Sequence, residues 1–227
     1  MYILCLLLIS GLAAFAAESR SEVAQRLDNA ATVLHEIMAT PDKGIPEDLL
    51  DKANCVVIVP GLKKGAFIVG AQYGKGFVTC RKAGAWSAPA AVKIEGGSVG
   101  LQIGGQETDA ILLVMNENGA KRLLSDKFTL GAEGSVAAGP VGRTSTAQTD
   151  AKMSAEILSY SRSRGAFAGL ALTGATLRPD EDSNAALYGK KLTSQEIVDG
   201  QVKAPSAASK LLAELTRYSP REKSADR

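Results

Sequence analysis

The chain has 227 residues, of which 45% are hydrophobic and 22% are charged. This composition is typical of a globular protein and excludes a chain that is disordered throughout. The formal net charge of +2 is too small to indicate nucleic-acid binding, so any anion binding would have to come from local clusters of cations.

The first 17 residues are almost wholly apolar and end in a small-x-small site near Ala16. This pattern predicts a secretory signal peptide over residues 1–17, because a membrane span needs about 20 apolar residues. No Lys or Arg precedes the apolar run. An uncleaved N-terminal membrane anchor is the alternative. We therefore expect a periplasmic or secreted protein, with one domain over residues 18–219 and a flexible charged tail over 220–227.

Two helical patterns follow the predicted signal peptide. Apolar residues recur at steps of three and four over 21–40, which predicts a helix with one apolar face. A second, short helix is expected from Pro46 through Lys52, because proline is tolerated in a first helical turn. Beyond these two helices the pattern changes to strands.

A series of short strands occupies the middle of the chain. The run Cys55–Val59 is of the buried type and is expected to end at Pro60-Gly61. Gly74-Lys75 is expected to form the turn of a hairpin, which would place Lys75 at its tip. Further strands are predicted at 66–73, 76–81, 86–94, 98–103, 109–115, 155–160 and 167–177.

Helical signals return near the C-terminus. The acidic turn Asp180–Asp182 is suited to capping a helix that runs to Tyr188. Thr193 and Glu196 match a capping box, and Pro205 is expected to open a last helix. Strands at this spacing favour antiparallel pairing, and the 23 glycines favour sharp bends. We predict one α+β domain with a curved, mostly antiparallel, partly closed sheet and with N-terminal and C-terminal helices.

Candidate metal ligands and cysteine pairs are few. Cys55 and Cys80 both lie in predicted strands and could form a disulfide in an oxidising compartment; two buried free thiols are the alternative. Residues 180–184 begin like a calcium loop, but Ala185 and Lys191 stand where the glycine and glutamate should be. We expect neither a metal nor a cofactor.

One motif suggests catalysis. Residues 96–100 match the G-x-S-x-G pattern of serine hydrolases around Ser98. That chemistry needs a histidine to accept the serine proton, and the chain's one histidine is His35, in the first predicted helix. A glycine-rich strand explains the motif better, so we expect a non-enzyme and keep a hydrolase only as a third hypothesis.

Four cations are candidates for anion binding. Lys63 and Lys64 fall in a predicted turn beside apolar strands, and Arg162 and Arg164 would share one face of an extended segment. Like charges at this spacing repel, so the arginines need a neutralising partner. A bound phosphate group, chelated by guanidinium, and the acidic turn Asp180–Asp182 are the two alternatives.

Three segments carry several ordered motifs: CVVIVPGLKKGAFIVGAQYGKGFVTCR (55–81), WSAPAAVKIEGGSVGLQIGGQETDAILLVMN (86–116) and YSRSRGAFAGLALTGATLRPDEDSNAALYG (160–189). At these residues the chain resembles the SYLF family, a lipid-binding domain also described as an actin-binding domain in fungal endocytic proteins. The resemblance implies lipid binding through a basic surface and an N-terminal amphipathic helix. The corresponding helix here, 21–40, also carries acidic residues, unlike a helix made for anionic membranes. A stand-alone domain behind a signal peptide resembles a bacterial, envelope-located member.

These observations give two leading hypotheses. The first is non-catalytic binding of anionic membrane phospholipids, with head groups held by Lys63, Lys64, Arg162 and Arg164. The alternative is a protein-interaction module with a scaffold or actin-like partner. No nucleic-acid partner is expected, and the sequence does not indicate an oligomeric state.

Overall fold

The structure is a computed structural model that describes residues 18–40, 44–67, 69–99, 104–140, 155–163, 166–169, 172, 174–200 and 202–219. The predicted signal peptide (1–17), the predicted tail (220–227) and Arg164 lie outside the described residues.

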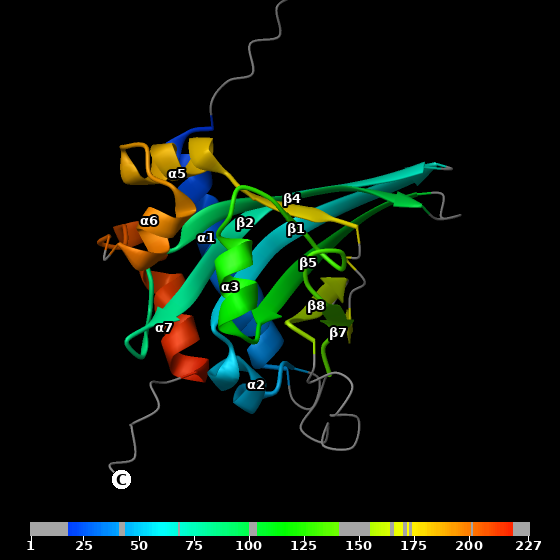
Figure 1. Cartoon of the computed structure of the whole chain (residues 1–227), viewed down its shortest axis with the longest axis horizontal. Coiled ribbons are helices and arrows are strands. Elements are labelled where there is room, and N and C mark those ends of the chain that lie inside the picture. Colours follow the sequence, from blue (N-terminus) through cyan, green and yellow to red (C-terminus); the bar gives the residue numbers. More distant parts are fainter. Residues whose placement is uncertain are drawn as a thin grey trace, which may run out of the picture.

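The described strands form one strongly curled sheet (Figure 1). Its main path runs in the order β6-β10-β4-β2-β1-β5-β8-β7, while β3 pairs with β2 and β9 with β8. All of these pairs are antiparallel except β7–β8. The strands are β1 (Cys55–Phe67), β2 (Val69–Lys82), β3 (Ala85–Trp86), β4 (Ala90–Val99), β5 (Gly104–Val114), β6 (Phe128–Thr129), β7 (Val136–Ala138), β8 (Ile157–Ser163), β9 (Ala166–Gly169) and β10 (Thr176–Pro179).

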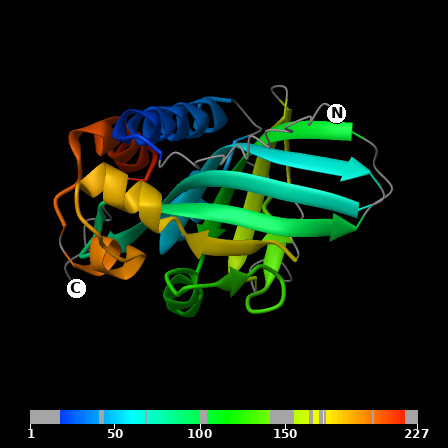
Figure 2. The ribbon, with the colours of Figure 1, turned by 90° about the horizontal axis from the view of Figure 1, so that it is seen from above.

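Helices precede, interrupt and follow the strands, which confirms the predicted α+β class with a curved, mostly antiparallel sheet. The long strands β1, β2, β4 and β5 extend past the group formed by α1, α5, α6 and α7 (Figure 2). The helices are α1 (Arg20–Met38), α2 (Glu47–Lys52), α3 (Glu117–Leu123), α5 (Glu181–Tyr188), α6 (Ser194–Asp199) and α7 (Ser209–Tyr218), with a 3-10 turn η2 (Ser206–Ala208) before α7.

Side-chain caps define where several helices begin. Asp180 accepts a hydrogen bond from the Ser183 N–H at the start of α5, so the predicted cap is confirmed. The predicted capping box of Thr193 and Glu196 opens α6. A second capping box, in which Ser19 and Glu22 exchange hydrogen bonds, opens α1 and was not foreseen from the sequence.

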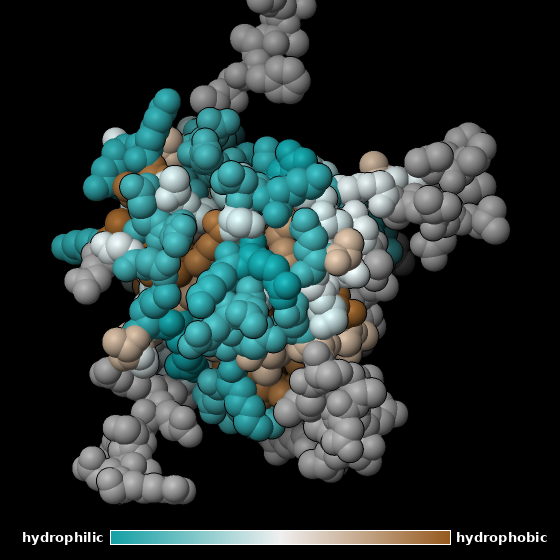
Figure 3. All heavy atoms as spheres, in the orientation of Figure 1, coloured by the Kyte–Doolittle hydropathy of each residue, from teal (hydrophilic) through white to brown (hydrophobic). Residues whose placement is uncertain are grey.

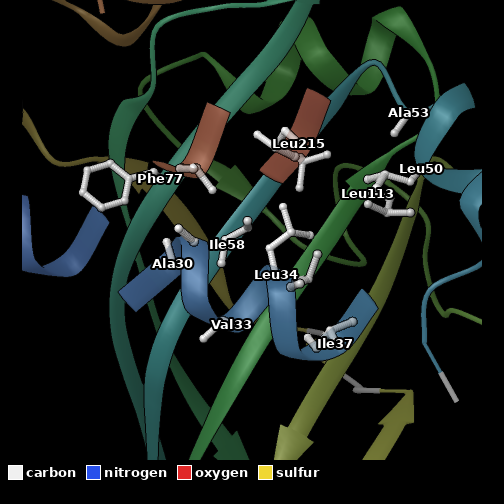
Figure 4. Close-up of a cluster of buried hydrophobic side chains, with 14 of the residues drawn as sticks. Ala30, Val33, Leu34, Ile37, Leu50, Ala53, Ile58, Phe77, Leu113 and Leu215 are labelled. Atoms are coloured by element: carbon white, nitrogen blue, oxygen red, sulfur yellow. The ribbon is translucent and has the colours of Figure 1, made fainter. Parts of the chain in front are cut away.

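Each face of the sheet is covered by its own hydrophobic cluster, because neighbouring strand residues point to opposite faces. Val56 and Ile58 of β1 belong to the cluster beneath α1 and α7, whereas Val57 and Val59 belong to the cluster on the far face. In Figure 4, Leu34 of α1 and Leu215 of α7 converge over Ile58. The apolar stripe of α1 is therefore buried in the core.

The first hairpin differs from the prediction in two places. β1 does not end at Pro60-Gly61 but continues through them as a bulge, seen as a register shift against both β2 and β5. Gly74-Lys75 does not form the turn, because β2 runs unbroken from Val69 to Lys82. Gly76 serves close packing, since a methyl group there would collide with the backbone of Ile58.

Cys55 and Cys80 are direct partners in the β1–β2 register. Their sulfur atoms form a disulfide with an S–S distance of 2.06 Å. Both residues are buried on the far face of the sheet, in the cluster that includes Val57 and Val59. The bond therefore closes the end of the hairpin that lies farthest from its turn.

Candidate functional site

A polar cavity of about 590 Å³ lies between α1 and the sheet, and we call it the α1 groove. From α1 it takes residues at steps of three and four, which form one stripe along the helix from Glu22 to Glu36. At 1.5 Å per residue this stripe is roughly 20 Å long. The lining consists of Glu18, Glu22, Gln25, Arg26, Asn29, Thr32, Val33, Glu36, Pro60, Gly61, Glu107, Asp109 and Arg162.

The bulge in β1 shapes the sheet side of the groove. Gly61 has a φ of +60°, a conformation that glycine adopts without steric cost. Its N–H donates to Oδ1 of Asp109 at 2.9 Å, and a Cβ at this position would lie 2.7 Å from Oε1 of Glu107. The bulge thus supplies a hydrogen-bond donor and leaves room for two carboxylates of β5.

Arg162 is neutralised inside the groove. It is the direct cross-strand partner of Asp109, and its Nε and Nη2 donate to Oδ2 of Asp109 at 2.9 and 2.7 Å. Its Nη1 forms an ion pair with Glu36 of α1. The prediction that the acidic turn Asp180–Asp182 is the internal partner of Arg162 was therefore wrong. The two carboxylates that do bind it come from α1 and β5.

Negative charge is in excess in the groove. Its lining holds five carboxylates and two guanidinium groups. Burial and the neighbouring Glu107 carboxylate raise the pKa of Asp109, while the hydrogen bond from Gly61 acts in the opposite direction. Burial lowers the pKa of Arg162. An incoming cation would relieve this imbalance, and an incoming anion would increase it.

A compact ionic network, which we call the Lys75 cluster, ties α1, β2 and α5 together at one end of the groove. Lys75 Nζ lies 2.9 Å from Asp180 Oδ2 and 3.1 Å from Glu18 Oε2. The network consists of Glu18, Arg26, Lys75, Asp180 and Ser183. Lys75 therefore lies in mid-strand under α1, and the prediction of a hairpin tip was wrong.

The Asp180 carboxylate is held in its charged form within the Lys75 cluster. Burial acts to raise the pKa of Asp180, but hydrogen bonds from Lys75 and Ser183, together with the charge of Lys75, hold it below its ordinary value. The same Ser183 hydroxyl lies 2.7 Å from both Asp180 Oδ2 and Glu18 Oε2. This arrangement is typical of an ionic network that stabilises a fold.

Comparison with known proteins identifies the family. Residues 95–218 match the Ysc84 family, described as "Las17-binding protein actin regulator". This chain belongs to the Ysc84 family. The resemblance to the SYLF domain family is thereby confirmed.

Several relatives in the Ysc84 family align with three quarters of this chain. SH3 domain-containing protein PJ696.02 of Schizosaccharomyces pombe is 38% identical over 74% of this chain and 40% of its own length. Protein YSC84 of Saccharomyces cerevisiae is 36% identical over 75% of this chain and 37% of its own length. LAS seventeen-binding protein 3 of the same species is 33% identical over 75% of this chain and 38% of its own length. The chain therefore spans about two fifths of the length of these relatives.

The structure separates the lysines proposed as head-group ligands. Lys63 is exposed and lies opposite Glu107 and Tyr73 on the face that carries α1. Lys64 is half-buried on the opposite face, where burial lowers its pKa. Of the four candidates, Lys63 and Arg162 share a face of the sheet, Lys64 does not, and Arg164 lies outside the described residues.

His35, the one histidine considered for catalysis, makes contacts between two helices in this Ysc84 family member. His35 Nδ1 lies 3.1 Å from Glu214 Oε2 and 3.5 Å from the Tyr218 hydroxyl, in the contact between α1 and α7. Ser98 lies near the end of β4, and its side chain is outside the described residues. Within the described ranges, no three His, Cys, Asp or Glu side chains are grouped to hold a metal ion. In the same ranges no helix is long and apolar enough to cross a membrane.

Proposed function

We propose that this chain is a non-catalytic protein-interaction module. Membership of the Ysc84 family carries the proposal, because the family is described by the proteins that it binds and regulates, Las17 and actin. The polar α1 groove supports it, since the groove offers an elongated surface bordered by one helix and three strands. The partners named for the family are the ones to test first.

Co-sedimentation with purified actin filaments, and pull-down by immobilised Las17, would test this proposal without any lipid. We expect saturable binding to at least one of the two proteins, unchanged when detergent removes residual lipid. A chain that stays in solution with both proteins, yet sediments with vesicles, would contradict the proposal.

Binding of anionic phospholipids is the second candidate function. It is supported by Lys63, an exposed cation on the face of the sheet that carries α1. The α1 groove itself does not favour an anion, because its carboxylates outnumber its cations and Arg162 is already paired. The described part of the face shown in Figure 3 is predominantly hydrophilic, which does not favour deep insertion of that face into lipid.

A liposome experiment would test the lipid-binding candidate separately. If Lys63 binds head groups, sedimentation with vesicles should rise with the content of anionic lipid and fall with salt. Lys63→Glu should reduce it, whereas Lys121→Glu, which alters an exposed lysine on α3, should not. Equal sedimentation with neutral and anionic vesicles would argue against this candidate.

We also propose that the protein works in an oxidising compartment, as the predicted signal peptide implies. The Cys55–Cys80 disulfide supports this location, because stable disulfides are rare in reducing compartments. Alkylation of intact cells followed by mass spectrometry should find both thiols protected. Alkylation of both cysteines before any reductant is added would count against this location.

A further inference from the structure

Two carboxylates of the α1 groove are exposed and form no ion pair with a described residue. Glu22 and Glu107 are both exposed, and neither forms an ion pair with any described residue. Glu22 accepts hydrogen bonds from Ser19 in its capping box, which lower its pKa, and the charge of Lys75 also helps to lower it. Lys63 is the cross-strand neighbour of Glu107 but forms no ion pair with it. The other groove carboxylates, in contrast, are bound to Arg26, Lys75 or Arg162. The groove therefore has two exposed carboxylates that are open to a further cationic partner.

The length of the groove indicates which shape of ligand fits it. The stretch of α1 that lines the groove, from Glu22 to Glu36, is roughly 20 Å long. An extended chain at roughly 3.3 Å per residue would span this length with about six residues.

An aromatic side chain stands beside the groove. Tyr73 is 46% exposed and is the one large hydrophobic side chain, among those described, that is exposed. It lies on the sheet face that carries α1, opposite Lys63. Exposed tyrosines are enriched where proteins bind partners, and their rings attract cationic side chains.

We propose that the α1 groove binds an extended, lysine- or arginine-bearing segment of a partner protein. The cationic side chains of that segment pair with Glu22 and Glu107, and one of them packs against Tyr73. Arg26 and Arg162 already pair with the remaining carboxylates, which leaves Glu22 and Glu107 for the partner. This inference rests on the proposed interaction function and adds the chemistry of the partner.

Fluorescence anisotropy with labelled hexapeptides tests this inference on the purified chain. The probes are RARARA and its acidic counterpart EAEAEA. We expect the basic peptide to bind measurably at low salt and the acidic peptide not to bind. The affinity should fall as salt is raised, because the exposed pairs are screened. Equal or tighter binding of the acidic peptide would overturn the inference.

Charge variants locate the binding. Glu107→Gln should weaken binding of the basic peptide about two- to fivefold, since an exposed pair contributes at most about 1 kcal/mol. Glu107→Arg should weaken it more, because it adds a repulsive charge. Asp126→Asn removes an exposed carboxylate outside the groove lining and should leave the affinity within twofold. Unchanged affinity in Glu107→Arg, with the wild-type circular dichroism spectrum, would refute the groove as the site.

The outcomes distinguish this inference from the function on which it rests. If Las17 or actin binds the wild-type chain and Glu107→Arg equally, the interaction function stands and the groove assignment fails. If neither protein partner binds but anionic vesicles do, the interaction function fails. If the basic peptide and the protein partner both lose affinity in Glu107→Arg, the two proposals are supported together.

Discussion

At the scale of single residues, the Lys75 cluster shows what local sequence can and cannot specify. The role of Asp180 as a helix cap follows from its place before Glu181 and Asp182, and the structure confirms it. Its ion pair with Lys75 joins residues 105 positions apart and has no signature in the spacing of the chain. The same holds for Arg162, whose partner Glu36 lies on α1.

Asp180→Asn should destabilise the protein at neutral pH. Asparagine still caps α5, so the change removes mainly the charge that pairs with Lys75. We expect a loss of about 1–2 kcal/mol in the free energy of unfolding. Because the folded-state pKa of Asp180 lies below its ordinary value of 3.8, this stabilisation is present above that value and is lost as pH falls through the folded-state pKa.

Urea denaturation of both proteins at pH 7 and pH 3 would measure this effect. The difference in stability should be largest at pH 7 and should shrink at pH 3. Asp182→Asn is the matched control, because Asp182 is exposed in the same helical turn and should matter much less. A difference that stays constant between the two pH values would show that the charge of Asp180 is not its stabilising feature.

At the scale of elements, helices were predicted correctly where the apolar period and the cap residues agree. The roles of two glycines in the strands were predicted wrongly. The helix over 21–40 and the capping box of α6 were confirmed, because apolar period and cap residues are local signals. Gly61 and Gly74 were assigned to a strand end and a turn. Their actual roles, at a bulge and beneath a neighbouring strand, depend on tertiary contacts that a linear pattern does not contain.

The Cys55–Cys80 disulfide should stabilise the β1–β2 hairpin. It closes a loop with a sequence separation of 25 residues, for which chain entropy alone predicts roughly 3 kcal/mol. The double variant Cys55→Ala, Cys80→Ala should lose about that much free energy of unfolding in guanidinium denaturation. Reductant should destabilise the wild type and leave the variant unchanged. Equal stability of the two oxidised proteins would refute this role.

At the scale of the whole molecule, α1 and α7 form one layer over the sheet. Their joint core includes Leu34 and Leu215, and Lys210 of α7 forms an ion pair with Asp28 of α1. The fold class could be predicted because strand spacing and terminal helices are visible in the sequence. The α1 groove could not, because it requires knowing that β1, β5 and β8 are neighbours beneath α1.

Leu215→Ala should weaken the whole fold. Leu215 is fully buried between α7, α1 and the sheet, so truncation leaves a cavity and costs about 2–5 kcal/mol. Thermal unfolding should show a lower Tm in one transition. Leu212→Ala, at a partly buried position of the same helix, should cost clearly less. A separate early transition would instead mean that α7 unfolds independently.

The pairing of α1 with α7 has a consequence for synthesis on the ribosome. His35 of α1 cannot contact Glu214 until the ribosome has added 179 further residues. During that interval the apolar stripe of α1 lacks the leucines of α7 that complete its cover. Until α7 (Ser209–Tyr218) has been synthesised, a nascent chain therefore exposes part of the apolar face of α1, and we expect chaperones that bind exposed apolar surfaces to bind it.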